Sequence, residues 1–196
     1  AGAAADALQR RPEPGVAPWT VEEVAPVVVA AHAFGAKVTA HSSHLAGARV
    51  GVAAGVDSIE HGMELDADLA ADMASRGTAL VSTLAIFRSW LGFGTTTTME
   101  RFADPERRTK ILDRQAGAEE SVRLEPAAGV AIATGTDCGG GSTRADQLAW
   151  EVECLVAAGL HPYGGDKIAL TTVLDELPHS NEARNLLGLL ASVGGV

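Results

Sequence analysis

The sequence has little of several features that would each point to a class of protein. None of its apolar runs approaches the roughly 20 residues that cross a membrane, and aromatic residues make up only 4% of the chain. Its two cysteines, Cys138 and Cys154, stand in no spacing typical of a structural zinc site, and isolated thiols favour a reducing, cytoplasmic location. Basic residues are outnumbered 15 to 25, and the net charge of −10 disfavours contact with nucleic acid or with an anionic membrane.

Short aliphatic runs, rich in Ala, Val, Leu and Gly, are abundant instead. Parallel strands that are buried on both faces have this composition, and 196 residues suffice for one domain with a sizeable core. A unit of glycine, aliphatic strand and polar residue recurs at 35–41, 55–61 and 77–83, and a longer copy spans 129–137. Repeated helix–glycine–strand units predict a parallel α/β sheet, which forms a (β/α) barrel if it closes.

Two histidines and an aspartate, His41, His61 and Asp137, stand at the ends of three of these predicted strands. The carboxyl ends of parallel strands meet at one edge of a sheet, where α/β folds place ligands and metals, so these side chains can converge. Imidazole nitrogens and a carboxylate suit zinc or another borderline divalent ion. A single histidine at a strand end more often has a structural, hydrogen-bonded role, but matched positions in adjacent units favour the metal site.

The motifs around these residues resemble the second half of a metal-dependent amidohydrolase. The resemblance is carried by V-T-A-H at 38–41, A-G-V-D-S-I-E-H-G at 54–62, a strand ending in S-T-L at 82–84, and A-T-G-T-D at 133–137. It extends over residues 20–189 and is similar to the imidazolonepropionase and Xaa-Pro dipeptidase-like branch. It implies a (β/α)8 barrel with one or two divalent metal ions, zinc foremost, at the carboxyl face.

The resemblance also implies roles for individual residues. His41 and His61 correspond to metal ligands that end the family's fifth and sixth strands. Asp137 corresponds to the residue that ends the eighth strand, binds metal and carries a proton from the hydrolytic water to the leaving group. A bound cation lowers the pKa of water and polarises a scissile carbonyl, and an adjacent carboxylate accepts the proton. Substrate contacts are expected from three further residues: His44, Thr83 and Arg88.

The sequence departs from the family's pattern in its missing ligands. The family's first strand carries H-x-H and its fourth a lysine that bridges the metals, but this sequence has no H-x-H, and Lys37 starts a strand. It therefore resembles strands five to eight without strands one to four and without the flanking β-domain, whereas a whole barrel takes about 250 residues. With three of the usual ligands, we expect weak metal affinity and negligible activity from the chain alone.

We expect residues 1–196 to form a single partial barrel domain. Residues 1–18 are predicted to be a loop, 84–102 a lid-like loop over the barrel mouth, and 161–196 a region of C-terminal helices. The outer strands of half a barrel expose backbone donors and acceptors. Such a chain is expected to aggregate, to pair with another half as a homo-oligomer, or to be an excerpt of a longer protein.

The function that these features predict is metal-dependent hydrolysis of amide or other C–N bonds in a small-molecule substrate, such as a cyclic amide or a dipeptide. Ser42 and Ser43 stand where the dipeptidase-like branch often has a tyrosine, which argues against prolyl dipeptides. Two alternatives stay open. One is a deaminase of the same superfamily, and the other is a non-catalytic half-barrel fragment that associates with a partner.

Overall fold

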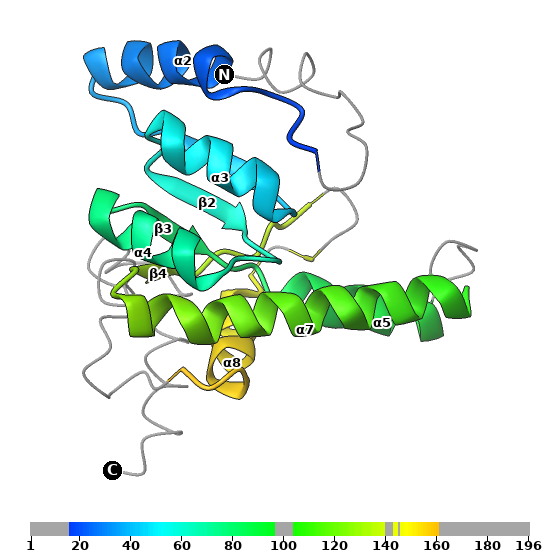
Figure 1. The fold of residues 1–196 in the computed structure, drawn as a ribbon. Helices are drawn as coiled ribbons and strands as arrows, with labels where there is room; N and C mark the ends of the chain where they lie inside the picture. The colour runs from blue at the N-terminus through cyan, green and yellow to red at the C-terminus, as the bar shows by residue number, and fades with distance from the viewer. Residues whose placement is uncertain (1–15, 97–103, 140–142, 145, 161–196) are drawn as a thin grey trace.

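The computed structural model describes residues 16–96, 104–139, 143–144 and 146–160 (Figure 1). Its sheet has the order β1-β2-β3-β4, and every neighbouring pair is parallel. The strands are β1 (Thr39–Ser42), β2 (Ser58–His61), β3 (Ala79–Val81) and β4 (Ile132–Ala133). The predicted parallel α/β sheet is confirmed. A doubly wound sheet reverses its strand order at a switch point, and this sheet shows no such reversal.

Helices connect and cover the strands. They are α2 (Val21–Ala33), α3 (Leu45–Ala54), α4 (Ala67–Arg76), α5 (Ala85–Thr96), α7 (Pro105–Ala128) and α8 (Leu148–Ala157). Figure 1 shows α3 and α4 over one face of the sheet, with α2 packed outside α3. Within the described ranges, no helix is both long enough and apolar enough to cross a membrane.

The helix ends follow the chemistry of their terminal residues. Left-handed C-caps at Gly55, Gly77 and Gly129 end α3, α4 and α7, whereas Gly35 directly follows Phe34, the C-cap of α2. Asp66 caps α4 by accepting a hydrogen bond from the backbone N–H of Leu69 at 2.9 Å. These local signals set where each strand can begin.

The first helix also begins as its sequence predicts. Thr20 and Glu23 form a capping box, in which the Thr20 N–H donates to the Glu23 carboxylate at 2.9 Å and the Glu23 N–H donates to the Thr20 hydroxyl at 3.4 Å. Pro26 lies inside α2 although an interior proline removes one intrahelical hydrogen bond. The packing of α2 against α3 therefore outweighs this local cost.

The prediction of a loop at 84–102 is wrong for Ala85–Thr96, which form α5. The segment is helical because it buries an apolar face: Ile86 and Phe87 are buried, and Phe87 meets Trp90 edge to face at 5.9 Å between ring centroids. Figure 1 shows α5 running outward from the sheet and α7 returning alongside it. Residues 97–102 lie outside the described residues, as do 1–15 of the predicted N-terminal loop and all of the predicted helices at 161–196.

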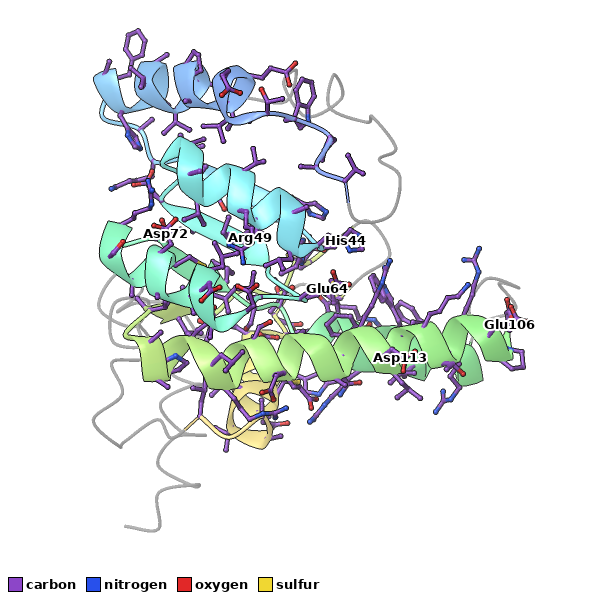
Figure 2. The ribbon with its side chains drawn as sticks, in the orientation of Figure 1. His44, Arg49, Glu64, Asp72, Glu106 and Asp113 are labelled. Carbon is purple, nitrogen blue, oxygen red and sulfur yellow. The ribbon has the colours of Figure 1, made fainter. Side chains whose placement is uncertain are left out.

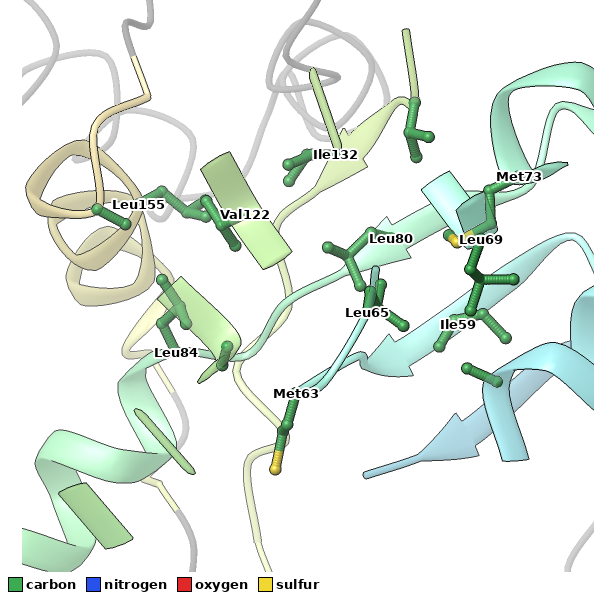
Figure 3. Packing of buried hydrophobic residues seen from close by; sticks show 14 of the residues in the cluster. Ile59, Met63, Leu65, Leu69, Met73, Leu80, Leu84, Val122, Ile132 and Leu155 are labelled. Atoms are coloured by element: carbon green, nitrogen blue, oxygen red, sulfur yellow. The ribbon is translucent and has the colours of Figure 1, made fainter. Parts of the chain in front are cut away.

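The hydrophobic core lies between the sheet and its helices. Figure 3 shows Ile59 and Leu80 of the strands facing Leu69 and Met73 of α4, and all four side chains are buried. Residues of the opposite sheet face are less covered: Thr39 and His41 are exposed, and their neighbours in β2 and β3 are only half-buried. The carboxyl end of the sheet is therefore reachable from the side that the helices leave open.

Candidate functional site

His41 and His61 meet at the carboxyl end of β1 and β2. Nε2 of His61 lies 2.8 Å from Nδ1 of His41, and the two rings meet edge to face with centroids 4.4 Å apart. The strand register pairs His61 with Ser42, whose hydroxyl faces Gly47 of α3. Regular alternation would thus point His61 toward the helices, away from His41. A break in the backbone of β2 is what brings the two rings together.

That break is a left-handed backbone at the strand end. Among the described residues, four that are not glycine have a positive φ: His61 (72°), Thr83 (50°), Asp137 (47°) and Asp146 (68°). The first three end their repeated units: His61 is the last residue of β2, whereas Thr83 and Asp137 follow β3 and β4. This conformation is strained for L-residues, above all for a β-branched threonine, and such strain clusters at functional sites. The same turn therefore recurs at three neighbouring strand ends.

Gly62 continues the left-handed turn after His61, with a φ of 53°. A Cβ atom at this position would lie 2.5 Å from Cδ1 of Leu80 and 2.9 Å from Cδ1 of Leu65. Only glycine fits both the backbone conformation and the close packing. The glycine of the I-E-H-G motif is therefore needed for the chain to turn after His61 in close contact with Leu65 and Leu80.

Thr83 holds the ring of His61 from the other side. Its hydroxyl oxygen lies 2.7 Å from Nδ1 of His61, and its side chain is fully buried. Because Nδ1 is engaged by Thr83, Nε2 is the nitrogen that faces His41. A fixed contact on one ring nitrogen is the usual way to orient a metal-binding imidazole. The expected contact of Thr83 with substrate stays a prediction.

The electrostatics of the site favour a neutral His61. Burial lowers its pKa to about 4, with a further contribution from His41 and an opposing one from Asp137. Burial also raises the pKa of Glu60, against a 2.9 Å hydrogen bond from the Thr39 hydroxyl and with a further upward contribution from Asp137. His61 is thus in the protonation state that binds metals, and Asp137 is near enough to act on both groups.

Asp137 itself lies beyond the end of β4 and is exposed. Its loop is closed by the Thr143 hydroxyl, which donates to the carbonyl of Thr136 at 2.6 Å, and by the Gly139 N–H, which donates to the carbonyl of Thr143 at 3.0 Å. In the part of the chain that the structure describes, no three His, Cys, Asp or Glu side chains are grouped closely enough to hold a metal ion. The structure thus joins His41 to His61 directly, and the charge of Asp137 acts on His61 and Glu60.

The two other residues expected to contact substrate, His44 and Arg88, interact with residues outside the histidine pair. His44 stands at the N-cap position of α3, and its Nδ1 lies 3.2 Å from the Glu64 carboxylate; Figure 2 shows the two residues next to each other. Burial raises the pKa values of Glu151 and Cys154 in α8, and the charge of Arg88 in α5 partly opposes this rise. His44 therefore borders the exposed carboxyl edge, whereas Arg88 acts on the neighbouring helix.

Two buried polar residues that the sequence analysis did not single out support the strand ends. The Ser121 hydroxyl of α7 accepts a hydrogen bond from the Leu65 N–H at 3.0 Å, in the loop after β2. Glu151 of α8 accepts hydrogen bonds from the loop after β3. Each interrupts the apolar face of its helix, beside Val122 and Val152 respectively. In the sequence, a polar residue at a position where the helix pattern calls for an apolar one is the signal that could have identified Ser121 and Glu151.

Comparison with known proteins places the fold in a wider group. No family profile matches the sequence. An uncharacterized protein of Mycobacterium tuberculosis is 32% identical over 142 residues, which cover 72% of this chain and 37% of that protein. An uncharacterized protein of Mycobacterium bovis matches with the same values. The chain spans about a third of the length of these curated relatives.

Solved structures that resemble this chain include enzymes of named activity. A Xaa-Pro dipeptidase with bound methionine in its active site is 31% identical with a TM-score of 0.59, over 72% of this chain and 34% of that one. A protein described as a prolidase from Bifidobacterium longum is 30% identical with a TM-score of 0.61, over 73% and 36%. The ochratoxinase of A. niger is 25% identical with a TM-score of 0.62, over 78% and 32%. These neighbours confirm the resemblance that the motifs predicted.

Proposed function

We propose that this chain, whose fold and motifs are those of part of the amidohydrolase superfamily, carries part of the divalent-metal site of a hydrolase of amide or other C–N bonds. The observation that carries the proposal is the histidine pair. The two facing nitrogens of His41 and His61 lie 2.8 Å apart, and Thr83 orients the buried ring. Neutral imidazoles are donors that zinc takes, so the histidine pair fits two of the ion's ligand positions, and the proposal adds the Asp137 carboxylate as a third.

His41 and His61 would hold the ion, with Asp137 as the third ligand. A divalent cation bound there supplies a water of lowered pKa and polarises the scissile carbonyl. We assign to the Asp137 carboxylate the transfer of a proton from the water to the leaving nitrogen; its exposure and its electrostatic action on both His61 and Glu60 support this assignment. Thr83 keeps the His61 ring in one orientation throughout.

The same proposal includes the architecture of the complete site, as half of a (β/α)8 barrel. Three features support it: the strand order does not reverse, α3 and α4 share one face of the sheet, and the carboxyl strand ends carry the polar residues. The sequence has no H-x-H motif, and it spans about a third of its relatives. We therefore expect the 196 residues to bind metal weakly and to turn over substrate negligibly.

The structural neighbours bear on the substrate. Two of them are described as a Xaa-Pro dipeptidase and a prolidase, which favours a dipeptide-like amide for this chain over a cyclic amide. Deamination by the same metal-activated water is the alternative within enzymes. A non-catalytic half-barrel that associates with a partner is the alternative outside enzymes.

Titration of the purified chain with Co²⁺ and Zn²⁺ tests the metal site. We expect one weakly bound ion per chain, and at least about a tenfold loss of affinity in His61→Ala and Asp137→Ala. His32→Ala is the matched control, because His32 lies at the other end of the sheet and pairs with Asp57. An unaltered affinity in the site variants, or no binding at all, contradicts the site and favours the non-catalytic alternative.

Activity assays on the same chain separate the enzyme classes. Cleavage of Xaa-Pro and other dipeptides reports the hydrolase, and ammonia release from amino-substituted heterocycles reports the deaminase. We expect negligible turnover of either kind from the 196 residues alone. Metal-dependent turnover by this chain contradicts its incompleteness, and its substrate then decides between the two chemistries.

A further inference from the structure

A buried carboxylate of α8 contacts both sides of Thr83. Glu151 has no solvent exposure, and its Oε1 accepts hydrogen bonds from the Ser82 hydroxyl and from the Leu84 N–H, both at 2.8 Å. Its Oε2 accepts a hydrogen bond from the Ala85 N–H at 2.6 Å. One side chain therefore ties the residue before Thr83 to the two residues after it.

Thr83 needs this restraint because of its backbone. Its φ of 50° is left-handed, a conformation that is unfavourable for an L-residue and rarer still for a β-branched side chain. A strained conformation persists only where its surroundings over-determine it. The hydrogen bonds from Ser82, Leu84 and Ala85 to Glu151 hold the backbone on both sides of Thr83 and so keep Thr83 in this conformation.

The donors also explain why the group is a carboxylate. The N–H groups of Leu84 and Ala85 stand at the start of α5, where helix N–H groups lack intrahelical partners and favour a negative charge. The Ser82 hydroxyl and these two N–H groups all donate to Glu151, so the position needs two accepting oxygens. A carboxylate supplies both, whereas a carboxamide of the same shape supplies one and adds a competing N–H donor.

We propose that Glu151 is a positioning residue, which sets the orientation and the tautomer of His61 through Thr83. The path is short and fully buried up to the imidazole: Glu151 holds the backbone around Thr83, the Thr83 hydroxyl lies 2.7 Å from Nδ1 of His61, and Nε2 of His61 faces His41. The inference goes beyond the proposed metal site, because every contact on the path is between residues of this chain and holds without an ion.

The test is the nitrogen-15 NMR signal of the His61 side chain in Glu151→Gln. In the unaltered chain we expect one neutral tautomer, seen as two well-separated ring-nitrogen shifts. Glu151→Gln is expected to move these shifts toward each other, in the same direction as Thr83→Val, which removes the hydroxyl at nearly constant shape. The double variant is expected to show no further shift, because both changes act on one path.

Glu153→Gln is the matched control, since Glu153 lies on the exposed side of the same helix and the variant should leave His61 unchanged. A folded Glu151→Gln chain with unaltered His61 shifts overturns the proposal. Should that variant not fold, Glu151→Asp keeps the carboxyl group and both its oxygens but withdraws them by one methylene. We expect the same shift at smaller size there, and an unchanged His61 signal again overturns the proposal.

Discussion

At each end of the parallel sheet a carboxylate acts on a histidine. Asp57 acts on the partly exposed His32 at the amino end, and Asp137 acts on the buried His61 at the carboxyl end. At the amino end, Asp57 accepts hydrogen bonds from Lys37 Nζ at 2.6 Å and from the Val38 N–H at 2.8 Å, and Nε2 of His32 lies 2.8 Å away. The Lys37 ammonium foremost, then the Val38 N–H, holds the pKa of Asp57 well below its usual range. At the carboxyl end, His61 is buried and its pKa lies at about 4.

The difference separates stability from function. The amino-end cluster of His32, Lys37 and Asp57 is partly exposed to water and joins α2 to the start of the strands. None of its residues has a positive φ, so its backbone is not strained. The carboxyl end keeps strained residues at three strand ends and a neutral imidazole among them. A strained backbone has a cost in folding and persists where chemistry uses it, as at the carboxyl face of a (β/α) fold.

The largest expected effect tests whether the carboxyl end depends on distant packing. A Cβ at Gly117 of α7 would lie 2.5 Å from the carbonyl oxygen of Met63, two residues after His61. Gly117→Ala must therefore push α7 from this loop, and we expect a loss of about 3 kcal/mol in the free energy of unfolding by urea denaturation. His61 NMR shifts should change with it, while those of His32 should not.

Gly92→Ala is the matched control for this variant, because Gly92 is also helical and a Cβ there meets nothing within 4 Å. It should leave stability unchanged or raise it by up to about 1 kcal/mol, as alanine favours helix. Equal losses in both variants would show that the close contact with Met63 has no special weight.

The next effect concerns Glu125, a second carboxyl group near the amino end, just before β4. It is fully buried, neither of its oxygens has a hydrogen-bond partner among the described residues, and burial raises its pKa to about 7. The folded chain thus keeps a proton that the unfolded chain releases above its usual pKa of 4.5. Stability is full below that value and falls as pH rises toward 7, by about 1.4 kcal/mol per pH unit at the steepest.

Glu125→Gln should remove this fall, measured as the difference in unfolding free energy from the unaltered chain between pH 4.5 and 8. The difference is needed because His61 acts in the opposite direction: its lowered pKa makes stability rise with pH between about 4 and 6.5. Glu120→Gln, at an exposed position of the same helix, should leave the profile unchanged. A pH profile that is the same with and without the Glu125 carboxyl group would refute the assignment.

A smaller effect is expected from Asp57→Asn at the amino end. The amide keeps one oxygen for Val38 but loses the charge that attracts Lys37, so we expect a loss of about 1–2 kcal/mol at pH 7. Because the pKa of Asp57 is lowered in the folded chain, its contribution is present above 3.8 and is lost as pH falls below that value. The two chains should therefore converge in stability at low pH, and His61 shifts should not move.

The smallest effect is expected at the rim of the carboxyl end. His44 and Glu64 are both about half exposed, and a pair of this kind contributes little in water. His44→Ala should change the unfolding free energy by less than about 0.5 kcal/mol and leave the His61 shifts as they are. If His44→Ala instead changes the His61 shifts, then His44 and Glu64 belong to the site itself and not only to its exposed edge.

Much of the fold could be predicted because its signals are local. The Thr20 capping box, the Asp66 N-cap and the helix-ending Gly55 and Gly77 depend only on residues within a turn, so each helix and strand falls close to its predicted place. The polar residue that ends each repeated unit was readable for the same reason. The sequence could not assign α5, because the buried face that makes 85–96 helical needs the partners α7 and α8.

By itself, then, the sequence determined which residues stand at the strand ends, and hence that His41, His61 and Asp137 share one edge of a parallel sheet. Only the tertiary structure decided that His61 turns against the alternation of its strand to meet His41. It also decided that Thr83 and the buried Glu151 support that turn. The reason is that a left-handed residue is unfavourable locally, and only contacts between residues far apart in the chain can hold it in place.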